Sequence, residues 1–154
     1  MSQYAEDSSL SAAGRFGRMT YIAWNCLLLL VIMAIIVVFS AVFPNLIMNM
    51  QTGSYGIGVI FIGLLYLVLF YFTIIFTIRR LHDRNHTGWL SLLMLVPAAN
   101  IVLALYLTFA AGDARPNSYG APRETRGWEN ILAWIYIVLL VVGLFAGIIM
   151  GISG

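Results

Sequence analysis

Four long stretches without charge alternate with short polar segments along this chain. The uncharged stretches are residues 21–43, 57–78, 89–111 and 131–149, and they consist mainly of aliphatic, aromatic and small side chains. A helix rises about 1.5 Å per residue, so about 20 apolar residues cross a hydrocarbon core of about 30 Å. The pattern predicts an all-α fold: a multi-pass transmembrane helical bundle with four apolar helical segments.

The polar segments mark the predicted boundaries. In chain order we expect a polar, interfacial segment over 1–20, spans over 21–43 and 57–78, an Arg-rich cytoplasmic motif over 79–88, a third apolar segment over 89–111, a polar loop over 112–130 and a last span over 131–151. All of them form one membrane domain. Four tryptophans lie near run ends, where amphipathic rings prefer the headgroup zone: Trp24, Trp89, Trp128 and Trp134.

The third apolar segment has two interpretations, because Pro97–Asn100 interrupts it. As a continuous span, with the N-terminus inside, it leaves five of the eight arginines on the cytoplasmic side. As a re-entrant hairpin it places all eight there, in better agreement with the tendency of basic loops to stay inside. We expect four full spans, since non-helical backbone at membrane depth must be shielded by protein. The hairpin is the alternative.

Composition supports a lipid environment. The 154 residues are 62% hydrophobic and 9% charged, whereas a soluble domain has about 25% charged residues. The formal net charge of +2 is too small to indicate nucleic-acid binding. The single cysteine, Cys26, excludes an intrachain disulfide.

The basic residues are all arginines, and most of them flank the apolar runs. Because arginine binds phosphate with two parallel hydrogen bonds, it suits contact with anionic headgroups. Our candidates for lipid or partner contact are Arg79, Arg80, His82, Asp83, Arg84, Trp89, Arg15 and Arg18. The alternative is a structural end-cap in which Asp83 pairs with its own arginines. His82, His86 and one carboxylate lack the further ligands of a zinc site, so we expect no metal.

Three separated motifs resemble those of a known family. Arg79-Arg80-Leu81-His82-Asp83 with Gly88-Trp89 lies between Gly14-Arg15-x-x-Arg18 and Asn117-x-Tyr119-Gly120-x-Pro122. This order resembles the YhaH-like family of small bacterial inner-membrane proteins, domain of unknown function 805. The resemblance covers about residues 13–123 and leaves the last apolar run as an extension. It implies an inner-membrane location and a small helical fold, with no catalytic residues to carry over.

The last apolar run carries glycines four residues apart, Gly143, Gly147 and Gly151. Such glycines line one helix face and let another backbone approach closely. We expect this face to pack within the monomer, against Asn100, Ala104, Thr108 and Gly112 of the third segment. The alternative is a homo-oligomer interface.

No Asp, Glu, Lys, Arg or His lies inside any apolar run, although ion-coupled transporters usually need such a group there. No nucleophile–base arrangement or phosphate-binding glycine loop is present either. We therefore expect a multi-pass inner-membrane protein with a cytoplasmic N-terminus, no cofactor and no enzymatic activity. It would act in the cell envelope through partner or anionic-lipid contacts. The alternatives are a small oligomeric channel or exporter and, with less support, a lipid-headgroup enzyme using His82 and Asp83.

Overall fold

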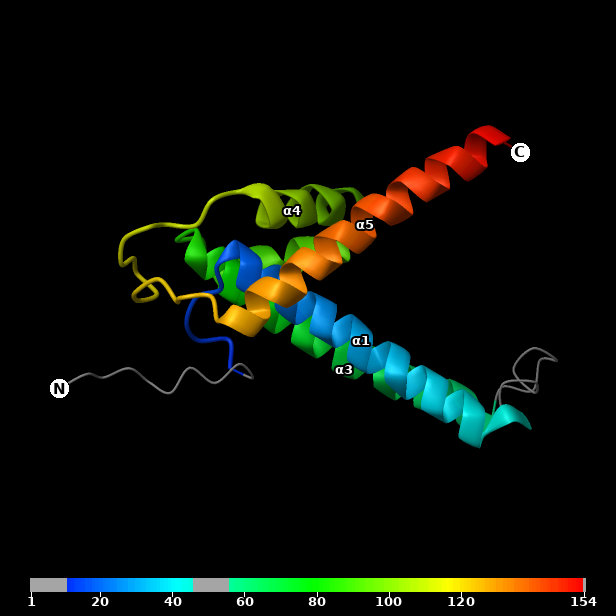
Figure 1. The fold of residues 1–154 in the computed structure, drawn as a ribbon. Coiled ribbons are helices and arrows are strands. Elements are labelled where there is room, and N and C mark those ends of the chain that lie inside the picture. Colours follow the sequence, from blue (N-terminus) through cyan, green and yellow to red (C-terminus); the bar gives the residue numbers. More distant parts are fainter. Residues whose placement is uncertain (1–10, 46–55, 154) are drawn as a thin grey trace.

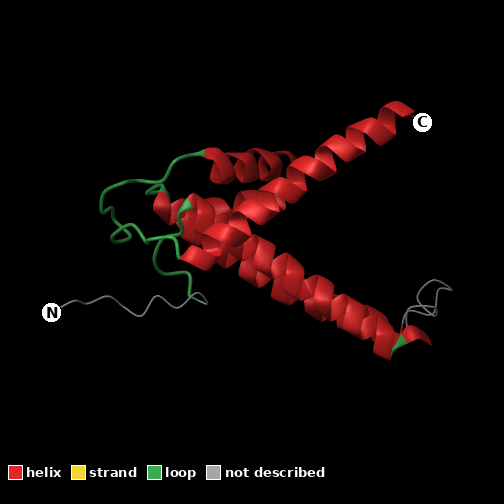
Figure 2. Cartoon of the chain, in the orientation of Figure 1, coloured by secondary structure: helices red, strands yellow, loops and turns green. Residues whose placement is uncertain are grey.

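The structure of the protein, a computed structural model, describes residues 11–45 and 56–153. Its helices are α1 (Arg18–Val42), α3 (Gly56–Asp83), the 3-10 helix η1 (Gly88–Leu95), α4 (Pro97–Phe109) and α5 (Gly127–Ser153). Within these described ranges there is no β-strand, only an isolated bridge between Asn117 and Gly120 (Figure 2). The predicted all-α membrane-helix class is confirmed.

Three helices are long and apolar enough to cross a membrane: Arg18–Val42, Gly58–Asp83 and Gly127–Ile152. At about 1.5 Å per residue, 25 residues of α1 extend about 37 Å, more than the hydrocarbon core of about 30 Å. Most of their apolar side chains face outward, which is the arrangement expected when lipid is the solvent.

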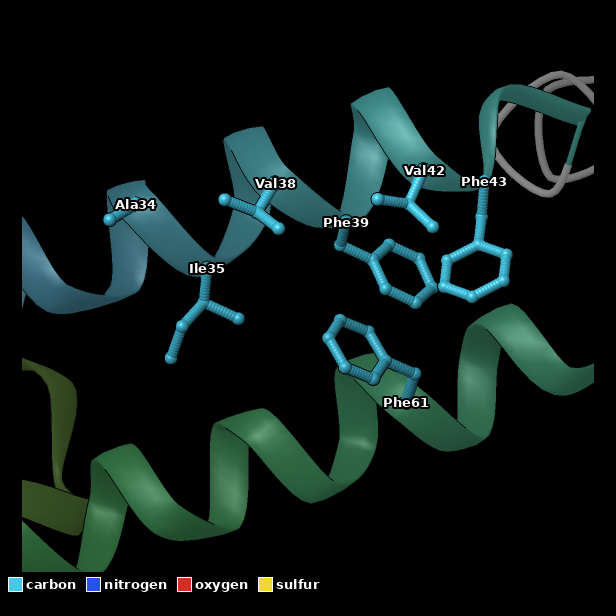
Figure 3. A pocket seen from close by; sticks show the side chains of 7 residues that line it. All are labelled: Ala34, Ile35, Val38, Phe39, Val42, Phe43 and Phe61. Carbon is cyan, nitrogen blue, oxygen red and sulfur yellow. The ribbon is translucent and has the colours of Figure 1, made fainter.

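Helices α1 and α3 lie side by side in opposite directions and form one limb of the molecule (Figure 1). At the limb's polar end, the Trp24 ring lies 5.7 Å from that of Phe76. At its far end, Phe39 stacks on Phe61 with ring centroids 3.7 Å apart, beside a wholly apolar groove (Figure 3). Aromatic contacts therefore hold this pair together at both ends.

Helix α5 forms a second limb. It crosses α1 near the start of both helices, where Ala23 and Ala133 are fully buried, and the two then diverge (Figure 1). Small residues at a crossing let the backbones approach closely. Among the helices that the structure describes, α5 packs against α1 alone.

The third apolar segment folds as a hairpin and not as one continuous helix. Gly88 lies against Ile78 at its start, and Arg80 donates to the Ala110 carbonyl just after its end. Both ends of the segment therefore lie at the C-terminal end of α3. The four-span expectation was wrong here, and the hairpin alternative describes the structure.

The break also lies earlier than predicted. Val96, with φ −102° and ψ 113°, is the extended residue between η1 and α4, and Pro97 begins α4. A residue before proline avoids the helical region, and proline suits the first turn of a helix because its missing N–H would be unpaired there. Residues 97–100 are accordingly the first turn of α4, not an irregular turn.

Candidate functional site

The charged residues at the end of α3 form a buried ion-pair cluster around Asp83. Arg15 donates through Nε and Nη2 to Oδ1 of Asp83, at 3.1 and 3.0 Å. Arg80, one turn earlier on α3, donates to Oδ2 from the opposite side. The two arginines are 1% exposed or less and Asp83 is 4% exposed. We name Arg15, Arg80 and Asp83 the arginine–aspartate cluster.

The remaining donors of this cluster bind backbone carbonyls from distant segments. Arg15 donates to the carbonyls of Arg115 and Gly120, each at 3.0 Å, and to that of Asp113. Arg80 donates to the carbonyls of Leu107 at 2.8 Å and Phe16 at 3.3 Å, and to that of Ala110. An arginine has five N–H donors in a rigid fork, which suits such multiple contacts. The cluster thus joins the N-terminal segment, α3, the hairpin and the loop after it.

Arg79 is also buried, but it faces Phe16 instead of the carboxylate. Its guanidinium carbon lies 4.0 Å from the centroid of the Phe16 ring, a cation–π contact. The backbone N–H of Phe16 donates to the Arg79 carbonyl at 3.0 Å. The segment before α1 is therefore fixed along the end of α3 through both side chain and backbone.

His82 lies on another side of α3 from Asp83 and has different partners. Its ring stacks on that of Tyr119, with centroids 3.8 Å apart and an interplanar angle of 6°. The His82 Nδ1 lies 3.3 Å from the Gly14 carbonyl. The side-chain amide of Asn117 donates to the backbone carbonyl of His82 at 2.8 Å. His82 and Asp83 are adjacent in the sequence, but their side chains contact different partners.

A second buried ionic site fixes the start of α5. Arg123 donates to both carboxylate oxygens of Glu129, at 2.9 and 2.8 Å. Trp24 and Thr20 of α1 donate to the same carboxylate, at 2.9 and 3.3 Å, and so does the backbone N–H of Arg126 at 2.9 Å. Glu129 is fully buried. This Glu129 site ties α5 and the preceding loop to α1.

The predicted contact residues therefore divide into two groups. Arg15, Arg79, Arg80 and Asp83 are buried in protein contacts, so the structure does not present them to a lipid or partner, and the end-cap interpretation describes them. Asp83 pairs with Arg15 and Arg80, and Arg79 lies over the Phe16 ring, so these buried charges have partners within the fold. His82 and Arg84 are half-buried, whereas Arg18 is exposed and Trp89 is 77% exposed.

The glycine face of α5 does not pack within the monomer as we expected. A Cβ placed on Gly143, Gly147 or Gly151 would meet nothing within 4 Å. Gly112, which we assigned to the opposing face, lies instead against Asp83. The expectation was wrong because α5 leaves the bundle after its crossing with α1.

Sequence reasoning missed the Glu129 site. The carboxylate and its α1 partners are more than 100 positions apart, so no local sequence motif contains both. One signal was available: Glu129 is an acidic residue in the first turn of a helix that is otherwise uncharged. A charge at the rim of a span usually has a specific partner.

No metal site is found in the part of the chain that the structure describes. There, no group of three or more His, Cys, Asp or Glu side chains lies close enough to hold an ion. His82 and His86 in particular diverge, since His86 Nε2 lies 2.7 Å from the Tyr106 hydroxyl.

Together these features define a class: a membrane protein of apolar helices whose polar end is closed by buried arginine–carboxylate contacts. The family model described as "Protein of unknown function (DUF805)" matches residues 9–121, and the chain belongs to this family. The match includes the arginine–aspartate cluster and ends before α5, in agreement with the expected extension. No curated protein and no solved structure matches the chain.

Proposed function

We propose that this protein is a non-enzymatic, multi-pass protein of the bacterial inner membrane that acts through contacts with other helices and with lipid. One observation carries the proposal. The far half of α5 extends from the rest of the chain, and its glycine face has open space around it. Glycines at this spacing let a second helix pack closely in lipid, where association depends on close fit.

The contacts of the two buried carboxylates at the polar end support a non-enzymatic role. A catalytic acid or base must reach the group whose proton it transfers. Asp83 is held by two arginines, and Glu129 by Arg123 and Trp24. These carboxylates therefore stabilise the fold.

The distribution of arginines supports a cytoplasmic location for the polar end, and with it a cytoplasmic N-terminus. Arginines from the N-terminal segment, from α3 and from the loop before α5 gather at this one end, as the contacts of Arg15, Arg80 and Arg123 show. Short arginine-rich segments stay in the cytoplasm. The test is labelling of Ser118→Cys, an exposed loop position, in a Cys26→Ala background. An impermeant maleimide should react in inverted vesicles only; reaction in intact cells would contradict the orientation.

A second copy of the chain is the partner that we propose for the glycine face. A groove on this face is lined by Leu140, Gly143, Leu144 and Gly147, among others. In native membranes, Leu144→Cys on the Cys26→Ala background should form a disulfide-linked dimer. Phe145→Cys, one residue along and outside the groove, is the matched control.

Adding Gly147→Leu should abolish the Leu144→Cys dimer, because the larger side chain separates the two backbones. Equal dimer formation at both positions, or no dimer at either, would contradict the proposed interface. Polar residues within the apolar helices give a channel or exporter no comparable support. Asn25, Thr73 and Thr108 each donate to a carbonyl of their own helix, at 2.8 Å.

A further inference from the structure

Helix α3 ends in a motif that turns the chain back over its own last turn. The His86 N–H donates to the Leu81 carbonyl and the Asn85 N–H to the His82 carbonyl, each at 3.0 Å. Asn85 has φ 54°, so the pattern is a Schellman motif with asparagine in the left-handed position. The motif brings His86 next to Tyr106 of α4, with His86 Nε2 2.7 Å from the Tyr106 hydroxyl.

An apolar groove begins at this histidine and runs between η1 and α4 toward the hairpin bend. Leu81 and Leu103 form its floor and are buried. Its rim includes Leu90, Leu93 and Val102, which are 37%, 39% and 67% exposed. The groove has a volume of about 490 Å³, within the range of about 300–1,000 Å³ typical of small-molecule sites.

An arginine with neutral partners lies beside the polar end of the groove and contacts Tyr106, which lines it. Arg84 donates through Nε to the Tyr106 hydroxyl at 3.0 Å and through Nη1 to the Ala111 carbonyl. In the described ranges no carboxylate pairs with it, in contrast to Arg15, Arg80 and Arg123. Arg84 is half-buried and retains donors on Nη2, so its charge favours an anion at this mouth.

We infer that this groove binds one acyl chain of an anionic phospholipid, with the lipid phosphate on Arg84. The acyl chain would lie on Leu81 and Leu103 and extend from Tyr106 toward Ala98. These positions are eight residues apart, which is about 12 Å along α4. This inference deepens the proposed function and rests on it, since both require this surface to face lipid.

The lining of the groove favours a lipid chain, because it is aliphatic except for His86 and Tyr106 at the end where Arg84 lies. The depth also fits, because Trp89 at the start of η1 is highly exposed beside the polar mouth, as expected at headgroup level.

The test uses the full chain in phosphatidylcholine nanodiscs and a phosphatidylglycerol probe with a diazirine in its acyl chain. Photolabelling followed by peptide mass spectrometry should place the label on the η1–α4 groove. A phosphatidylcholine probe with the same diazirine should label it about tenfold less, the difference expected from one charge-assisted contact. Soluble glycerol phosphate should not displace the probe, since it has no chain.

Two kinds of variant distinguish the contribution of the lipid's acyl chain to binding from that of its headgroup. Ala99→Leu fills the groove and should remove the label, whereas Ala104→Leu, the same change at an exposed position of α4 outside the groove, should leave it unchanged. Arg84→Gln should abolish the preference for phosphatidylglycerol, and Arg84→Lys, which keeps the charge, should retain part of it. Thermal unfolding of each variant verifies that it is folded.

Three results would overturn the inference. They are equal labelling by both probes, displacement of the probe by glycerol phosphate alone, and a disulfide between two copies that carry Leu93→Cys. Such a disulfide would show that a second copy of the protein, and not lipid, covers the groove. The α5 crosslink is measured on a different helix. If the phosphatidylglycerol probe fails to label the groove of the unsubstituted protein while Leu144→Cys still forms its dimer, the lipid site is refuted and the proposed function stands.

Discussion

Replacing Gly112 by alanine places a methyl group against a buried carboxylate. A Cβ at this position would lie 1.8 Å from Oδ2, 2.6 Å from Cγ and 3.0 Å from Oδ1 of Asp83. Ordinary contact begins at 3.4 Å, so the carboxylate would have to retreat by about 1.6 Å. Because Arg15 and Arg80 hold it on two sides, a movement of this size breaks at least one of the two ion pairs.

The expected cost follows from the burial of the cluster. Separating a buried ion pair so that one charge is left without its partner costs about 3–5 kcal/mol. For a chain of this size we expect the midpoint of thermal unfolding to fall by roughly 6–20 °C. The measurement is thermal unfolding of the purified protein in detergent, followed through the fluorescence of its tryptophans. Gly127→Ala, where an added Cβ meets nothing within 4 Å, is the matched control and should change the midpoint little.

A double variant distinguishes this steric mechanism from a general effect of losing glycine. In Asp83→Ala the clashing carboxylate is absent, so adding Gly112→Ala should cause almost no further loss of stability. Contacting residues show such non-additivity, with interaction energies of about 0.5–3 kcal/mol. Wild-type stability of Gly112→Ala, or losses that simply add in the double variant, would refute the reasoning.

Substitutions at three further positions test the contacts of the polar end, each by unfolding in detergent. Arg15→Lys should cost about 3 kcal/mol despite keeping the charge, because lysine cannot reproduce the arginine fork; stability equal to wild type would contradict this. Glu129→Gln should cost about 2 kcal/mol and speed trypsin cleavage after Arg123, whose partner becomes neutral; unchanged cleavage would argue against the Glu129 site. Asn85→Val should cost about 1–2 kcal/mol more than Asn85→Gly, since both lose the bond from the Ser118 N–H but only valine strains the left-handed position.

The apolar helices were predictable because the membrane restricts the alternatives so strongly. A chain in lipid must satisfy its backbone hydrogen bonds internally, so long uncharged runs become helices. What the runs did not show is that helices continue into charged sequence. α1 begins at Arg18, and α3 continues through Arg79, Arg80 and Asp83. In the last turn of α3, protein contacts satisfy the side chains of Arg80 and Asp83.

The distribution of arginines in the sequence favoured the hairpin. Four spans were expected because non-helical backbone at membrane depth must be shielded by protein. The structure answers that objection: the Val96 N–H donates to the Leu93 carbonyl at 3.1 Å, and Asn100 donates to the Val96 carbonyl at 2.8 Å. A 3-10 helix followed directly by an α-helix therefore reverses the chain while these backbone groups at the bend remain hydrogen-bonded.

The arginine–aspartate cluster was predictable only in part. The end-cap alternative paired Asp83 with its own arginines, and the structure has this pairing for Arg80 but places Arg79 against Phe16. The contribution of Arg15, 68 positions away, and the tight approach of Gly112 depend on the path of two loops. Long-range contacts of this kind leave no periodic pattern in the sequence.

The position of the Glu129 site relative to the family match explains how α5 is attached. Thr20 and Trp24 lie within the matched residues 9–121, whereas Arg123 and Glu129 lie beyond them. The extension thus supplies both the carboxylate and its arginine, and the core supplies two neutral donors. Only the start of α5 is fixed in this way, so its far half can engage a second helix without disturbing the polar end. A partner contact on α5 and a structural role for the buried arginines are therefore compatible within one fold.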